Sequence, residues 1–347
     1  MVGGRRGDAR AARGARARPR RGAGVTRHAP AGDPPPDTLS FGGSHGPRVV
    51  ALGDSISVGV GDAAGEDALH GIGWAAHLAQ LAGASSFTNL ARNGARARHV
   101  VAEQLPHALD LRPDVATLVV GGNDVLRSDF SAHEVARELS TAVTALRDCG
   151  CSVVLARLPA IELFELLPAT VRRVMRARVL AVNAAVDAVA LAAQPRTVEQ
   201  VTAARRTPDG RRPLQGTVVV VDIGGAAREL GPVAWHSDRV HPSATAHRRV
   251  AAHAALALGR AGVLRVRDAD GADALAAALP AMPPAPSFGA RTAWLVIAGI
   301  PWCFRRGRDF LPGLVRAVYD DRRERRHASR WMATFRASHL GASEKTS

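Results

Sequence analysis

Four short groups of residues, met in one order along the chain, carry the side-chain types of nucleophilic catalysis. They are Gly-Asp-Ser at 53–55, Asn-Gly at 93–94, Gly-Gly-Asn-Asp at 121–124, and Asp238 three residues before His241. A serine hydroxyl attacks efficiently only when a nearby base takes its proton, and an acid is needed to orient that base. The groups therefore contain a candidate nucleophile, base and orienting acid, together with donors suited to a developing oxyanion.

Each group follows an apolar run with the pattern of a buried strand. Runs at 48–52, 87–90 and 115–120 lead to the first three groups, and a β-branched run at 217–223 precedes the loop that holds Asp238 and His241. A further strand is predicted at 152–158, and helical patterns are predicted at 73–82, 95–109, 132–147, 168–193 and 243–258. Alternating strands and helices favour a parallel sheet between two helical layers, whose strand ends meet at one crevice.

With these groups in this order, the chain resembles the SGNH or GDSL hydrolase family over residues 48–262. The resemblance implies a flavodoxin-like α/β/α sandwich with a mostly parallel five-stranded sheet. It also implies a cofactor-free esterase or lipase that forms an acyl-enzyme on Ser55, with His241 as base and Asp238 orienting it. The oxyanion hole implied is the N–H of Ser55, the N–H of Gly94 and the side-chain amide of Asn123.

The resemblance further implies small-molecule or lipid ester substrates, including short acyl esters, thioesters and lysophospholipids. The segment 159–170 holds a set of large apolar residues, Ile161, Leu163, Phe164, Leu166 and Leu167, which are either a wall for the acyl group or helix core. The residues alone leave both interpretations open.

Local structural roles compete with the catalytic ones. Ser55 also suits a helix cap, Gly94 suits a plain turn, and Asp124 is interpreted as a loop residue that bonds nearby backbone. His77 and His107 are expected to be solvated or to have satisfied local partners, His247 is expected to be structural, and His236 is expected either to line the pocket or to be exposed. No Cys, His and Asp set has zinc-like spacing, so no metal is predicted.

Charge divides the chain into parts. The total net charge is +15, of which residues 1–47 carry +6 and residues 291–347 carry +7, leaving +2 for the region between them. We predict a disordered basic tail at 1–47, the hydrolase domain at 48–262, an Ala/Pro-rich linker at 263–290, and a basic, partly amphipathic extension at 291–347. An apolar stripe within 291–337 is expected to dock on an anionic membrane, cover the pocket as a lid, or pack on the domain.

The remaining predictions concern location and partners. No apolar run before Val49 has the length of a signal peptide, and none elsewhere has the roughly 20 residues of a spanning helix, so a cytoplasmic protein is expected. Cys149 and Cys151 are too close in sequence for a good disulfide. No specific nucleic-acid motif is present. The alternatives to an enzyme are a catalytically idle binding module and a protein whose arginine tails associate with nucleic acid or anionic membrane.

Overall fold

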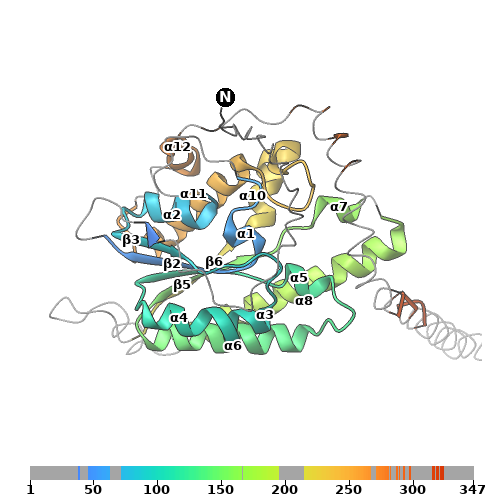
Figure 1. Ribbon diagram of the computed structural model, residues 1–347, viewed down its shortest axis with the longest axis horizontal. Helices are drawn as coiled ribbons and strands as arrows, with labels where there is room; N and C mark the ends of the chain where they lie inside the picture. The colour runs from blue at the N-terminus through green and yellow to red at the C-terminus, as the bar shows by residue number, and fades with distance from the viewer. Residues whose placement is uncertain are drawn as a thin grey trace, which may run out of the picture. The chain divides into compact units, whose positions relative to one another are not determined.

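The computed structural model describes residues 38–39, 46–62, 72–165, 167–194, 215–266 and 271–280, with isolated residues and short runs from 282 to 323. Figure 1 shows a central sheet with helices on both faces. The sheet order is β1-β3-β2-β4-β5-β6. Its strands are β1 (Thr38–Leu39), β2 (Arg48–Gly53), β3 (Ser86–Asn89), β4 (Val115–Val119), β5 (Ser152–Arg157) and β6 (Val218–Asp222). The predicted three-layer fold with five parallel strands is confirmed.

The inner strands are buried because helices cover both faces of the sheet. All five positions of β4 are buried, as are the last five of β2. This explains why these strands appear in the sequence as continuous apolar runs rather than as alternating ones.

Two groups of helices cover the faces (Figure 1). One face carries α2 (Trp74–Leu81), α10 (Ile223–Leu230), α11 (Ala244–Arg260) and α12 (Gly271–Ala277). The other carries α3 (Ala97–His99), α4 (Leu105–Asp110), α5 (Gly122–Val125), α6 (Ala132–Asp148) and α8 (Ala169–Ala192). Short helical turns complete the fold: α1 (Ser55–Val58), α7 (Glu162–Glu165), and a 3-10 turn at Gly231–Ala234.

The single helix predicted at 95–109 is interrupted. A π-helical turn, Val100–Gln104, separates α3 from α4. Such turns are rare and often lie at functional sites. Here the turn ends at Gln104, whose side chain reaches the residue two positions before Ser55.

The predicted boundaries need two corrections. Thr38–Leu39, inside the range expected to be a disordered tail, pair antiparallel with β3 as β1. Residues 271–277, inside the expected linker, form α12, which packs on α11. The alanines that gave this segment its linker-like composition are strong helix formers, and α11 offers them a surface. The rest of the basic tail lies outside the described residues, apart from Gly46 and Pro47.

The C-terminal extension is described only in part. Asp321 forms an ion pair with Arg173 of α8 at 2.6 Å, and Val318 packs against the main core. These contacts favour the packing alternative for this stretch. Val315 and Tyr319 remain about two-thirds exposed, at 65% and 66%. Most of 291–337 lies outside the described residues, so membrane docking stays a prediction.

Candidate active site

Ser55 lies directly beyond the end of β2, in a turn that requires glycine. Gly53 has φ 130°, and a Cβ there would lie 2.0 Å from the carbonyl oxygen of Val119 on the neighbouring strand. Asp54 then caps α1, since its Oδ1 accepts a hydrogen bond from the N–H of Ile56 at 3.1 Å. Asp54, rather than Ser55, is therefore the helix cap, which leaves the Ser55 hydroxyl for another partner.

That partner is His241. The Nε2 atom of His241 lies 2.7 Å from Ser55 Oγ, and its Nδ1 atom lies 2.6 Å from Asp238 Oδ2. Residues 186 positions apart in the sequence thus form one hydrogen-bonded chain. This is the arrangement in which an imidazole can take a proton from a hydroxyl while a carboxylate holds its tautomer.

The loop that carries the pair is closed on itself. Trp235 pairs with Pro242, and the N–H of His236 donates to the carbonyl of His241 at 3.0 Å. Asp238 Oδ1 accepts hydrogen bonds from the backbone N–H groups of Val240 and His241. The carboxylate is thereby aimed at the imidazole before any substrate arrives. Ser243 caps α11 immediately afterwards, so the loop is anchored to a long helix.

Asp238 stays ionised in spite of its burial. Burial opposes the charged form, but the nearby imidazole of His236 and the hydrogen bonds from His241 outweigh it and hold the pKa of Asp238 well below its ordinary value. His236 contributes because its Nδ1 lies 3.4 Å from the same Oδ2 atom that His241 uses. Its side chain is 31% exposed, so it is half-buried beside the loop. Two histidines thus share one carboxylate oxygen.

Asp54 has the opposite environment. It is 2% exposed, and burial raises its pKa to about 7 even though Ile56 and His241 act in the other direction. A carboxyl next to the Ser55 backbone therefore changes charge near neutral pH. Sequence reasoning treated Asp54 only as part of a motif.

The two predicted oxyanion positions, Gly94 and Asn123, are brought together. Gly94 has φ 80° within a turn closed by a bond from the N–H of Ala95 to the carbonyl of Arg92. The amide Nδ2 of Asn123 donates to the carbonyl of Ala95, the residue after Gly94, at 3.1 Å. An amide nitrogen carries two N–H groups, so Asn123 keeps one for a further acceptor.

Asp124 has a larger role than the local one expected. It is 1% exposed, and its carboxylate accepts from Arg96 Nε and from the N–H of Ala97, both at 3.1 Å. Arg96 also pairs with Asp129 at 3.0 Å. This buried ion pair joins the loop of Asn123 to the loop of Gly94, and it fixes their separation. Removing one member of such a pair is strongly destabilising.

Gln104 was not among the site residues predicted from the sequence. Its Oε1 accepts from the N–H of Gly53 at 2.7 Å, and its Nε2 donates to the carbonyl of Gly53 at 2.9 Å. One amide side chain thus satisfies both backbone groups of the glycine that precedes the Asp54–Ser55 turn. No sequence signal identifies a glutamine in a helical pattern as such a partner.

His77 and His247 are structural, as expected, but they belong to one cluster. His77 Nε2 lies 2.7 Å from Asp62 Oδ2, and both side chains are fully buried. His247 Nδ1 accepts from the N–H of Trp74, so Nε2 carries the proton and donates to the carbonyl of Val60. Burial lowers the pKa of His247 to about 4, which matches this neutral form.

The cluster holds the segment after α1 against the loop of His241. A Cβ on Gly61 would lie 2.1 Å from the carbonyl oxygen of Pro242, so the two backbones touch. The same short stretch is fixed at Val60 by His247 and at Asp62 by His77 and the N–H of Gly73. The position of the His241 loop therefore depends on two buried histidines, His247 on the helix that follows the loop and His77 on α2, which is remote from it in sequence.

The expected apolar wall belongs partly to the core. Ile161 and Phe164 are 8% and 6% exposed and pack in the main cluster, and Leu166 lies outside the described residues. The N–H of Leu163 donates to the carbonyl of Arg239, so α7 does border the His241 loop. The core interpretation holds for the two buried residues.

The described residues contain no group of three or more His, Cys, Asp or Glu side chains placed to hold a metal ion. Cys149 and Cys151 form no disulfide with each other or with another described residue. Within the same described ranges, no helix has both the length and the apolar character needed to cross a membrane.

An α/β sheet with a Ser-His-Asp chain at its strand ends defines a class of acyl-transferring hydrolases. The chain belongs to the GDSL-like lipase/acylhydrolase family, whose model matches residues 51–249. The protein is accordingly a hydrolase that acts on ester bonds.

Solved structures with similar chains include Axe2, an acetylxylan esterase from Geobacillus stearothermophilus, and LAE5, an alpha/beta hydrolase enzyme from the metagenome of Lake Arreo, Spain. Axe2 is 21% identical, with 64% of this chain and 94% of that chain covered and a TM-score of 0.42. LAE5 is 22% identical, with 64% and 97% covered and a TM-score of 0.43. Among curated proteins, none matches the chain.

Proposed function

We propose that the protein hydrolyses carboxylic esters through an acyl-enzyme on Ser55. The observation that carries the proposal is the 2.7 Å approach of His241 Nε2 to Ser55 Oγ, with Asp238 bonded to the other ring nitrogen. Ser55 Oγ attacks the ester carbonyl while its proton passes to His241 Nε2. Asp238, kept anionic, stabilises the imidazolium that forms.

The negative charge on the carbonyl oxygen then needs donors. As the first residue of α1, Ser55 has a backbone N–H without an acceptor in its own helix. We assign this group, the N–H of Gly94 and the second N–H of the Asn123 amide to the oxyanion hole. The bond from Asn123 to Ala95 supports this assignment, because it holds the amide beside the Gly94 turn.

The remaining steps use the same residues. The tetrahedral intermediate collapses, the alcohol leaves with the proton from His241, and Ser55 keeps the acyl group. Water then gives a proton to His241 Nε2 and attacks the acyl carbonyl. Ser55 leaves with that proton, and the carboxylic acid is released. No cofactor enters either half of the reaction.

The substrate we propose is an ester with a short acyl group. Two of the five large apolar residues that were candidates to line an acyl channel, Ile161 and Phe164, pack in the hydrophobic core. A long acyl chain would therefore need a wall built from other residues. Short acyl groups need only the space between Ser55 and the donors.

Hydrolysis of p-nitrophenyl esters from acetate to palmitate tests the proposal. Ser55→Ala should lower kcat by on the order of 10⁴- to 10⁶-fold, since the nucleophile and base act as one unit. Ser140→Ala, an exposed serine on α6, is the matched control and should be unaffected. A fluorophosphonate should add one mass adduct, located on Ser55 by peptide mapping. Equal activity of wild type and Ser55→Ala, or an adduct elsewhere, would refute the assignment.

A further inference from the structure

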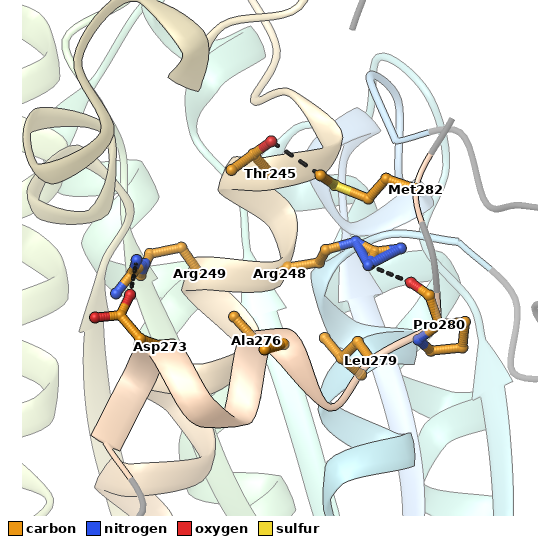
Figure 2. A pocket seen from close by; sticks show the side chains of 9 residues that line it. Thr245, Arg248, Arg249, Asp273, Ala276, Leu279, Pro280 and Met282 are labelled. Carbon is orange, nitrogen blue, oxygen red and sulfur yellow. Dashed lines mark hydrogen bonds and ion pairs between the residues drawn. The ribbon is translucent and has the colours of Figure 1, made fainter. Parts of the chain in front are cut away.

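A cavity whose lining does not include Ser55 lies between α11 and the segment that contains α12. Its volume is about 360 Å³, near the lower end of the roughly 300–1,000 Å³ of ligand pockets. Figure 2 shows α11 contributing Thr245, Arg248 and Arg249, while Asp273, Ala276, Leu279, Pro280 and Met282 come from the other segment. The lining thus joins two arginines to a largely apolar wall.

Arg248 is the unusual member of this lining. It is 5% exposed, its guanidinium donates to the carbonyl of Pro280, and its Nε–H has no hydrogen-bond acceptor. Among the described residues it makes no ion pair. Burial lowers its pKa, and the charge of Asp62 offsets this only in part. Buried charges in proteins are normally paired, so Arg248 lacks the partner that its environment calls for.

Arg249 differs in that it already has counter-ions. It pairs with Asp273, which Figure 2 shows on the opposite side of the cavity lining from Pro280, and with Glu229 at 3.9 Å. Its Nε–H nevertheless has no acceptor. The cavity is therefore lined by Arg249, which is paired, and by Arg248, which makes no direct ion pair with a described residue.

We propose that this cavity binds a monocarboxylate with a short hydrocarbon body. A carboxylate matches the planar guanidinium of Arg248 in shape and charge, and it can accept from the guanidinium N–H groups that border the cavity. Because Arg248 makes no direct ion pair with a described residue, a ligand with a single negative charge suits it. Leu279, Pro280 and Met282 offer apolar contact to a hydrocarbon but no donors to the extra oxygens of a phosphate.

The test is calorimetric titration of the full-length protein with sodium hexanoate, with hexanol, hexylamine, acetate and inorganic phosphate as separate arms. We expect hexanoate to bind at one site and to raise Tm, and we expect hexanol, hexylamine and phosphate to bind at least tenfold more weakly. Acetate should bind more weakly than hexanoate because it lacks the apolar body. Equal binding of hexanol would overturn the role of charge, and equal binding of phosphate would overturn the carboxylate.

Substitutions in the cavity lining test whether hexanoate binds there rather than elsewhere on the protein. Arg248→Met keeps the length of the side chain and removes the charge, and it should weaken hexanoate binding at least tenfold. Arg137→Met, at an exposed arginine of α6, is the control and should bind as wild type does. Ala276→Glu places a carboxylate in the cavity itself, so it should abolish binding and raise Tm even if Arg248→Met folds poorly.

Protein with a fluorophosphonate on Ser55 separates this proposal from the proposed function. Hexanoate should bind that adduct as it binds the free enzyme, whatever the catalytic outcome. Loss of binding in the adduct would place hexanoate at Ser55 and overturn the second site. Unchanged hexanoate binding in both Arg248→Met and Ala276→Glu would also overturn the proposed site between α11 and α12.

Discussion

Gln104→Leu measures how strongly the turn before Ser55 depends on one buried amide. Gln104 is 2% exposed and holds both the N–H and the carbonyl of Gly53. Leucine has a similar size, so the change removes hydrogen bonds rather than volume. The buried N–H of Gly53 is then left without a partner, while its carbonyl keeps the hydrogen bond from the N–H of Arg92 at 3.1 Å.

The expected loss follows from the two hydrogen bonds removed. Leaving the N–H unsatisfied costs about 1–3 kcal/mol and losing one of the two bonds to the carbonyl costs about 0.5–1.5 kcal/mol, which gives about 1.5–4.5 kcal/mol. This is a large part of the roughly 5–15 kcal/mol by which domains are stable. With an m-value of about 3 kcal/mol/M, the urea midpoint should fall by about 0.5–1.5 M. The kcat for p-nitrophenyl acetate should fall as well, because Gly53 sets the direction of the turn to Ser55.

Gln80→Leu is the matched control, measured by the same urea unfolding. The Oε1 atom of Gln80 in α2 is buried and has no hydrogen-bond donor. The same substitution there should leave the free energy of unfolding unchanged or raise it. If Gln104→Leu lost no more stability than Gln80→Leu, the reasoning from unsatisfied backbone groups would be refuted.

Three further predictions concern the candidate site. Asn123→Ala should lower kcat for p-nitrophenyl acetate by about 100- to 1,000-fold with little change in KM, as expected for a lost oxyanion donor. His236→Gln should move the acidic limb of the pH profile of kcat/KM upward by about 0.5–1 unit, because the second imidazole beside Asp238 Oδ2 is removed and the negative charge of that carboxylate then acts on His241 alone. Asp54→Asn should make the protein more stable at pH 8 but not at pH 4, measured as Tm in both buffers. The folded pKa of Asp54 is raised to about 7, so wild type loses stability as pH rises from about 4 to 7, whereas asparagine keeps the cap and does not ionise.

Each of these has a control and a contrary outcome. Asn93→Ala, at an exposed neighbour of Gly94, should keep kcat within a few-fold, and an equal loss there would argue against a specific donor. His133→Gln, at an exposed histidine of α6, should leave the pH profile unchanged, and an identical profile for His236→Gln would remove His236 from the site. For Asp110→Asn, an exposed residue, no pH-dependent gain is expected. The same flat result for Asp54→Asn would mean that Asp54 is ionised throughout.

The alternation of strands and helices could be predicted from sequence because its cause is local. Strands buried on both faces need unbroken apolar runs, and β2, β4 and β5 have them at 48–53, 115–119 and 152–157. The positions of Ser55 and Asn123 at strand ends follow directly from those runs. Boundaries failed where composition was ambiguous, as in the alanine-rich segment that forms α12.

Partners remote in sequence could not be predicted, because no pattern in either segment marks them. Gln104 reaches Gly53 across 51 positions, and His247 reaches Val60 across 187. The pairing of Asp124 with Arg96 was missed for the same reason, although it sits beside a predicted site residue.

The sequence by itself determined the order of elements and the residue types delivered to one edge of the sheet, since both depend on short-range patterns of apolar and polar residues. The tertiary structure alone decided that His241 meets Ser55 at 2.7 Å, that Asp54 rather than Ser55 caps α1, and that Arg248 is buried with no direct ion pair to any residue that the structure describes. Distance, burial and charge environment arise only when the helices close on the sheet. They belong to no single segment of the chain.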